Sequence, residues 1–216
     1  SVLERMNAEL CNSVCGLENS QEILASLDRA NLFIIPLDDE RQWYRFHHLF
    51  TDLLHMRLEQ TWPELVMTLH QRAAKWCESN GLISEAVHHA IAGRDDELLI
   101  QLIEVNARTI GDYDLVRLAE QLNGLPDDML RAQPWISIAR SWALVHSGQL
   151  DSVEPSLLNA EKVIQELGLL REYEQNRLIG HIATIRGYCL ALYGNLHAAK
   201  EFLRRGLQVL PKEDEA

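Results

Sequence analysis

Nine histidines are the side chains of this 216-residue chain most able to bind a metal ion or move a proton near neutral pH. His48, Asp52 and His55 are spaced so that they share one face of a helix, and such a face could present three ligands to a zinc ion. We favour a simpler interpretation, the half-exposed polar edge of an amphipathic helix, because helical spacing of this kind arises readily by chance. We therefore predict no metal site.

Motifs for the common catalytic centres are absent from the sequence. A P-loop needs a glycine-rich stretch ending in Gly-Lys-Ser or Gly-Lys-Thr, because backbone amides and the lysine must surround the phosphates, and no such string occurs. Gly-x-Ser-x-Gly and His-Glu-x-x-His are absent as well. The acid pairs Asp38-Asp39 and Asp95-Asp96 are better explained as a turn and a helix cap. We assign no catalytic residue and expect no enzyme activity from this region.

Composition favours a helical, acidic protein with a sizeable core. Hydrophobic residues make up 47% of the chain, and 11 Gly and 6 Pro are too few turn-formers for a many-stranded all-β protein. The formal charge of −12 argues against a nucleic-acid clamp or an anionic-membrane binder. Four cysteines without a C-x-x-C pair indicate free thiols in a reducing compartment, so we expect a cytoplasmic protein. No apolar run is long enough for a membrane span.

The first sixty residues have the pattern of two helices followed by a β-hairpin. Residues 2–14 read as a helix closed by Gly16, and a second helix runs from Ser20 to about Asn31. Residues 33–37 and 41–47 then form two short strands around an acidic turn, and we expect no other strand. This order matches the later part of a winged helix. Because the hairpin tip carries carboxylates that would repel phosphates, we expect no direct nucleic-acid contact.

From His48 onward the apolar residues have the helical period, with short polar links between helices. Turn glycines at Gly81, Gly148 and Gly194 are flanked by small residues where two helices would cross closely, as in a tetratricopeptide repeat. A weaker copy of this helix-pair repeat has its turn at Gly111. Pro155 fits only if its helix begins near Ser152, which places the ring in the first turn. The predicted fold is all-α: a partial winged helix over residues 1–60, then a tetratricopeptide-like helix-pair solenoid over 61–216.

Several stretches resemble one protein family in both content and order. The most specific is the run 32–54, with Trp43-Tyr44-Arg45-Phe46-His47-His48-Leu49-Phe50 at its centre. Further agreement lies in residues 69–76, 85–93, 122–126 and 142–148. Nearly the whole chain resembles the large ATP-binding LuxR-type transcriptional regulators, the group of the maltose-regulon activator.

The resemblance implies a larger protein, with an N-terminal P-loop ATPase module, a winged helix, a tetratricopeptide-like sensor and a C-terminal DNA-binding helix-turn-helix. The present chain begins at Ser1 without a methionine, and we expect it to be an excised piece covering part of the winged helix and the start of the sensor. ATP or ADP is then expected for the full-length protein, and no cofactor for this region alone. His47 matches the family's Trp-Tyr-Arg-Tyr-His-x-Leu-Phe pattern, with Phe46 for Tyr, and the resemblance assigns it to the phosphate of bound ADP. A histidine that simply packs at the end of the hairpin is the alternative.

Three functional hypotheses follow. In the first, a small-molecule inducer or a regulatory protein binds the solenoid surface, and the region passes that signal to the ATPase module of the same chain. In the second, the chain is a stand-alone tetratricopeptide-like scaffold for a protein partner. In the third it is an enzyme, with the face of His48, Asp52 and His55 as the nearest candidate centre. A homodimer that forms through an exposed end of the solenoid is a further possibility. No membrane partner is expected.

Overall fold

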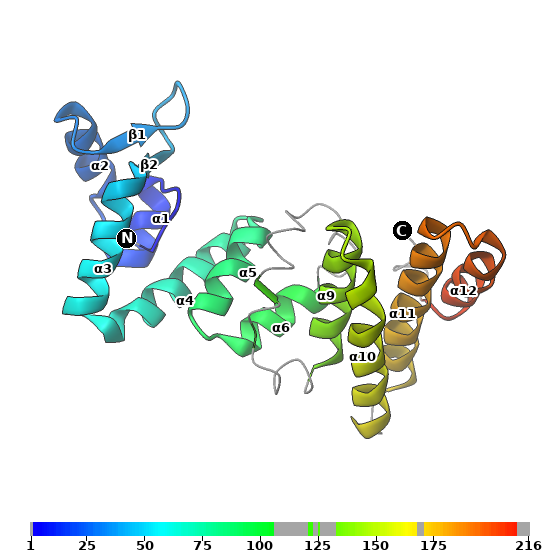
Figure 1. Ribbon diagram of the computed structural model, residues 1–216. Helices are drawn as coiled ribbons and strands as arrows, with labels where there is room; N and C mark the ends of the chain where they lie inside the picture. Colours follow the sequence, from blue (N-terminus) through cyan, green and yellow to red (C-terminus); the bar gives the residue numbers. More distant parts are fainter. Residues whose placement is uncertain (1, 106–120, 123–124, 126–132, 168–170, 211–216) are drawn as a thin grey trace. The chain divides into compact units, whose positions relative to one another are not determined.

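The computed structural model describes residues 2–105, 121–122, 125, 133–167 and 171–210 (Figure 1). Two compact units make up the chain, Ser1–Leu99 and Ile100–Ala216. Helices dominate both units, and the sheet found among the described residues has two strands. The all-α prediction with one hairpin is therefore confirmed. No helix in this part of the chain is long and apolar enough to cross a membrane.

Two helices, a hairpin and a third helix open the first unit, as the sequence predicts. They are α1 (Ala8–Cys15), α2 (Ser20–Arg29), β1 (Ile34–Pro36), β2 (Tyr44–Phe46) and α3 (His48–Thr61). The strands pair antiparallel, with Ile35 opposite Arg45. Gly16 ends α1 in the left-handed conformation, at φ 69°, which glycine adopts without steric cost.

The expected helix over residues 2–14 is wrong in its first half. The helix begins only at Ala8, because the side chain of Asn7 caps it by accepting a hydrogen bond from the Leu10 amide at 2.8 Å. Met6 instead forms an isolated antiparallel bridge to Tyr44, with both backbone hydrogen bonds at 2.8 Å. The segment before α1 therefore pairs with the edge of β2 through one isolated bridge, and the described residues form no strand beyond the two of the hairpin.

The core of the winged helix joins this leading segment to α1, α2, both strands and the helix that follows α3. Its buried residues are Val2, Leu3, Met6, Leu10, Val14, Leu24, Ile34, Tyr44 and Ala73. Ala73 belongs to α4 (Pro63–Ser79), so the core that stabilises the hairpin also holds the next helix in place.

Helices then follow in antiparallel pairs, each joined through a glycine in the left-handed backbone conformation. In the first unit, α4 and α5 (Ile83–Ala92) meet at Gly81, whose φ is 71°. The helix α6 (Asp96–Val105) follows, and the Asp95 carboxylate caps it by accepting from the Leu98 amide at 3.2 Å. The predicted cap at Asp95 is confirmed. The helix α5 has no side-chain cap, and Ser84 lies inside it.

Two further pairs form the described part of the second unit. One comprises α9 (Pro134–His146) and α10 (Val153–Leu167), linked through Gly148 and the short 3-10 helix η2 (Leu150–Ser152). The other comprises α11 (Glu172–Leu192) and α12 (Leu196–Val209), linked through Gly194.

Pro155 lies in the first turn of α10, where its missing N–H costs nothing. This placement confirms the prediction made for it. The weaker copy expected at Gly111 falls outside the described residues.

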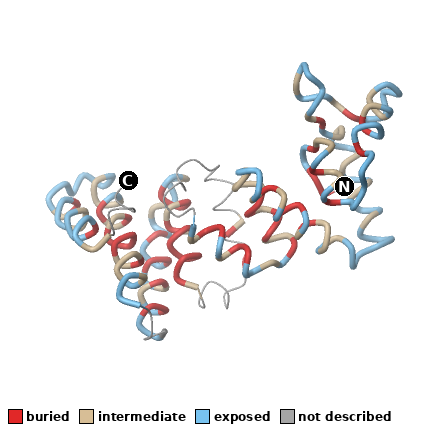
Figure 2. Tube along the Cα trace, turned by 180° about the vertical axis from the view of Figure 1, so that it is seen from behind, coloured by how far each residue is buried: buried red, intermediate tan, exposed pale blue. Residues whose placement is uncertain are grey.

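Small residues let the paired helices approach closely, as the repeat pattern predicts. Ala74, Ala86, Ser141 and Ala160 are fully buried. A Cβ added at Gly187 would lie 2.7 Å from Cγ of Leu203, so α11 and α12 are in close contact there. Buried positions follow the facing sides of the pairs, and the outer side of α12 is exposed (Figure 2). The helix-pair arrangement is thus confirmed, and its assignment to the tetratricopeptide subtype stays a prediction.

Candidate functional site

His47 lies at the junction of the hairpin and α3. Its backbone N–H donates to the Phe33 carbonyl at 2.8 Å, and its own carbonyl accepts from the amides of Phe50 and Thr51 at 2.8 and 3.0 Å. His47 is therefore the N-cap residue of α3, and no side chain caps this helix. The half-buried imidazole packs against that of His48, with ring centroids 4.4 Å apart. Two imidazoles thus gather at the N-terminal end of a 14-residue helix.

This arrangement is chemically suited to an anion. The His47 carbonyl takes the Phe50 and Thr51 amides, which leaves the His48 and Leu49 amides of the first turn without a partner inside the helix. The helix dipole also favours negative charge at that end. A protonated imidazole beside them adds hydrogen-bond donors and positive charge. The location of His47 is thus compatible with the phosphate contact that the family resemblance implies.

Phe33 is an element of this junction that sequence reasoning missed. Its φ is +54°, a conformation that a bulky side chain rarely adopts. Phe33 is 57% exposed, and its ring stacks on that of Phe50 with centroids 4.9 Å apart. Since the Phe33 carbonyl accepts from the His47 amide, the strained residue is anchored directly beside His47. The sequence holds no signal for this conformation, because glycine or asparagine is the usual residue there.

The candidate metal face on α3 does not form a ligand set. His48 and Asp52 are exposed, and His55 directs Nε2 to Glu59 Oε1 at 3.3 Å. Within the ranges that the structure describes, no three His, Cys, Asp or Glu side chains are placed to hold a metal ion.

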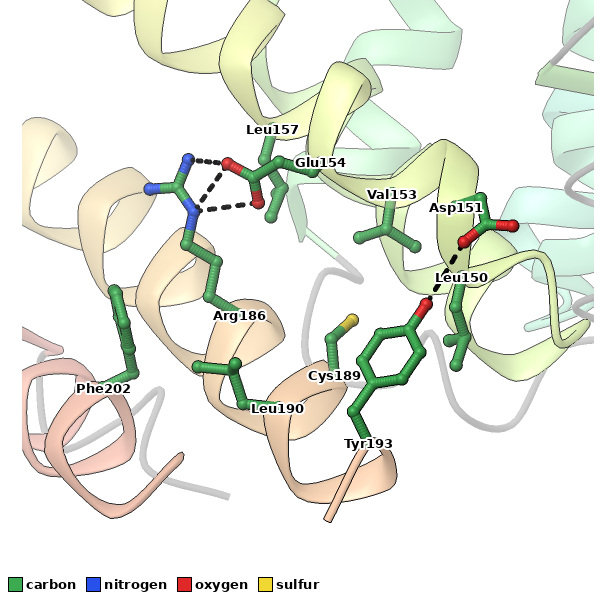
Figure 3. Close-up of a pocket in the computed structure, with 10 residues that line it drawn as sticks. All are labelled: Leu150, Asp151, Val153, Glu154, Leu157, Arg186, Cys189, Leu190, Tyr193 and Phe202. Atoms are coloured by element: carbon green, nitrogen blue, oxygen red, sulfur yellow. Dashed lines mark hydrogen bonds and ion pairs between the residues drawn. The ribbon is translucent and has the colours of Figure 1, made fainter. Parts of the chain in front are cut away.

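The second unit holds a groove of about 480 Å³ that sequence reasoning also missed (Figure 3). It lies among η2, α10, α11 and α12, and we call it the α10–α12 groove. Its lining residues are Leu150, Asp151, Val153, Glu154, Leu157, Arg186, Cys189, Leu190, Tyr193 and Phe202. These residues come from four elements and share no motif, so they come together only in the folded helix pairs.

Arg186 marks one end of the α10–α12 groove. Its guanidinium pairs with Glu154 through Nε and Nη2, at 2.6 to 3.2 Å, and with Glu161 through Nη1 and Nη2, at 2.5 and 3.0 Å. The hydrogen bonds to Glu161 raise the pKa of Arg186, burial opposes the rise, and those to Glu154 add to it. The guanidinium therefore stays charged, and each of its three nitrogens donates to a carboxylate.

Tyr193 and Asp151 mark the other end. The Tyr193 hydroxyl donates to Asp151 Oδ1 at 3.3 Å (Figure 3). Cys189 lies between the two ends, and burial raises the pKa of its thiol, which therefore stays protonated near neutral pH. The groove thus has an apolar wall, an ion-pair cluster around Arg186 at one end, and an acidic corner formed by Asp151 and Tyr193 at the other.

Comparisons with known proteins agree with the fold of the first unit. Residues 1–66 match the family model of the MalT winged helix domain. Serine/threonine-protein kinase PknK of two Mycobacterium tuberculosis strains and of Mycobacterium bovis is 31% identical to this chain over 169 residues. The match covers 74% of this chain, but the chain spans only about 15% of the length of these curated relatives. No solved structure matches. The chain thus opens with a winged helix similar to that of MalT, which supports a relationship to regulators of the MalT and LuxR type.

Proposed function

We propose that this chain is a regulatory region of an ATP-dependent transcriptional regulator. Its helix pairs would bind an inducer or a regulatory partner, and its winged helix would pass that event to an ATPase module of the same protein. The match of residues 1–66 to the MalT winged helix supports the proposal, and so does the order of winged helix and helix pairs along the chain. The ATPase module and a DNA-binding domain belong to the proposed parent protein.

The main structural observation behind this proposal is the exposed face of α3. The helix has 14 residues and buries none of them. Leu49, Leu53 and Met56 lie along one side at 68, 51 and 49% exposure, and we call them the α3 ridge. Large apolar side chains gathered on one exposed face mark an interaction surface. We assign the ATPase module to this surface, because His47, the residue that the resemblance places at the nucleotide, begins the same helix.

His47 would act as a sensor of the nucleotide state. An imidazole contact to the phosphate of ADP, together with the first-turn amides of α3, would hold the winged helix against the ATPase module in the resting protein. An inducer shifts such an equilibrium only if it binds the open state more tightly than the resting state. The helix pairs offer the surface on which that difference would arise.

The similarity to PknK bears on the same proposal. That relative is named a serine/threonine-protein kinase, whereas the kinase strings His-Arg-Asp and Asp-Phe-Gly do not occur in the present sequence. We therefore assign no kinase activity to this chain. The chain is similar to part of a kinase and to part of a transcriptional regulator. We infer that a region of this kind passes signals to different output domains.

Sequencing the flanking coding region tests the proposed architecture. We expect a P-loop upstream and a helix-turn-helix downstream. Stop codons on both sides would favour the stand-alone scaffold instead.

The role of His47 is tested in the parent protein by His47→Ala, with His197→Ala as the control because that imidazole is 93% exposed on α12. We expect the His47 variant to copurify with less ADP and to show higher basal activity. Normal ADP retention together with normal basal activity would refute the role.

A further inference from the structure

We propose that the α10–α12 groove binds a small molecule that carries one protonated amine on an apolar body. This inference deepens the proposed function, because it names the class of inducer that the helix pairs would sense. It stands on three observations within the second unit: the size of the groove, the balance of its charges, and the geometry at Asp151 and Tyr193.

The size and lining suit a small organic molecule. A volume of about 480 Å³ falls within the range of typical small-molecule sites. Most of the wall is apolar and comes from four helical elements, η2, α10, α11 and α12. The apolar lining residues are Leu150, Val153, Leu157, Leu190 and Phe202. A ligand body of one aromatic ring or a short alkyl chain would bury its surface against this wall.

The charges oppose an anionic ligand. Arg186 is the cationic side chain of the lining, and each of its three nitrogens already donates to Glu154 or Glu161. Asp151 adds a third carboxylate at the other end of the groove. The carboxylates of Glu154 and Asp151 line the groove, and that of Glu161 pairs with Arg186 from outside the lining. Against one guanidinium they leave an excess of negative charge, which attracts a cation and repels a carboxylate or phosphate.

The corner at Asp151 and Tyr193 has the chemistry that recognises an ammonium group. Asp151 uses Oδ1 to accept from the Tyr193 hydroxyl, and an ionised carboxylate can accept several more hydrogen bonds. Tyr193 is exposed, at 61% for the whole residue, so its ring is accessible to a cation. The phenol thereby orients the carboxylate while its ring offers a second contact. Since Figure 3 places this corner across the groove from Arg186, a bound amine would lie away from the guanidinium.

The test uses the 216-residue chain and three probes of matched shape. Phenethylamine, 2-phenylethanol and 3-phenylpropionate present the same ring with a cationic, a neutral and an anionic end. Binding is followed by NMR titration at pH 7. We expect phenethylamine to bind with a Kd of about 1 mM or tighter, and the other two at least about tenfold more weakly.

Variants of Asp151 and Tyr193 test whether phenethylamine binds at their corner of the groove. Asp151→Asn should weaken phenethylamine binding at least about tenfold, whereas Tyr193→Phe, which keeps the ring, should weaken it less than Tyr193→Ala. Glu201→Gln is the control, because it removes one exposed carboxylate of α12 outside the groove. Circular dichroism verifies that each variant keeps its helices.

The inference would be overturned by equal affinity for all three probes, by tighter binding of the carboxylate, or by amine binding that survives Asp151→Asn unchanged. An absence of binding by phenethylamine would do the same. None of these outcomes touches the winged-helix proposal, since that proposal is tested separately through His47 and ADP retention.

Discussion

The imidazoles of His70 on α4 and His89 on α5 meet Nδ1 to Nδ1 at 2.9 Å inside the first unit. Both residues are buried, at 6 and 5% exposure. One ring must donate and the other accept, so the accepting ring has to be neutral. Burial is the largest cause that lowers the pKa of His70, to about 4, and positive charge on His88 and His55 lowers it further. This helix pair therefore requires histidine in its neutral form.

The buried histidine pair predicts a loss of stability in acid. The unfolded chain takes up a proton near pH 6.5, and folded His70 does so only near pH 4, so the unfolded state binds more protons between these values. The stabilisation is complete above pH 6.5 and is lost as the pH falls toward 4. We expect the contribution of His70 to amount to about 1–3 kcal/mol. Urea unfolding at pH 7 and pH 5 measures it.

Two variants separate His70 from the acid titration of the carboxylates. His70→Gln should lose less stability than the parent chain between pH 7 and pH 5. His197→Gln, on an imidazole that is 93% exposed, should retain the full pH dependence. An identical pH dependence in all three proteins would contradict the assignment.

Close packing of α11 on α12 predicts that Gly206 does not tolerate a side chain. An added Cβ would lie 2.7 Å from Thr184 Oγ1 and 3.2 Å from the Gly180 carbonyl oxygen, so the helices must move apart. We expect Gly206→Ala to lower the free energy of unfolding by about 1–2 kcal/mol, although alanine is the better helix former. Gln208→Ala, on the exposed side of the same helix, should change it by less than about 0.5 kcal/mol. A stabilised Gly206→Ala variant would show that the helices are further apart.

Removing the charge of Arg186 should lower the free energy of unfolding more than removing one partner of an exposed ion pair. The Arg186 side chain is 18% exposed and pairs with Glu154 and Glu161. Arg186→Met should cost about 1–2 kcal/mol of stability, because it leaves two carboxylates close together. Lys162 offers the matched control: it is 71% exposed and lies 3.7 Å from Glu166, so Lys162→Met should cost at most about 0.5 kcal/mol. Equal losses in urea unfolding would argue against a structural role for the cluster.

The hairpin turn predicts different roles for two adjacent acids. Asp38 accepts hydrogen bonds from the amides of Gln42 and Trp43 at 2.7 and 2.9 Å, whereas Asp39 is exposed. Asp38→Ala should destabilise the chain by about 1 kcal/mol, and Asp39→Ala by less than about 0.5 kcal/mol. Thermal unfolding by circular dichroism compares the two. The opposite order would mean that another residue forms the turn.

Much of the fold could be predicted from the sequence because its signals are local. The turn glycines Gly81, Gly148 and Gly194 all adopt positive φ, as a glycine between two helices does, and the acid pair at Asp38 forms the predicted turn. The sequence pattern places the start of the first helix too early, because Leu3 and Met6 continue the helical spacing of Leu10 and Val14. The pairing of Met6 with Tyr44 is a contact between distant parts of the chain, which a local pattern does not contain.

The candidate sites were harder to predict for the same reason. His47 could be singled out because it stands in a motif of contiguous residues. The α10–α12 groove could not, since its lining extends from Leu150 to Phe202 over several helices. The strained Phe33 was also missed, because its φ is set by the hydrogen bond from His47 and the stacking on Phe50. Tertiary contacts determine all of these features.

The α3 ridge gives the most direct test of the proposed coupling. In the parent protein, Leu53→Glu places a charge on the surface that we assign to the ATPase module, and Leu158→Glu places one on α10 at a side chain of nearly equal exposure, 54% against 51%. The measurement is the amount of ADP that copurifies with each protein. We predict that Leu53→Glu lowers it at least about fivefold and that Leu158→Glu leaves it unchanged. Equal ADP retention in both variants and the parent would contradict a docking role for the ridge.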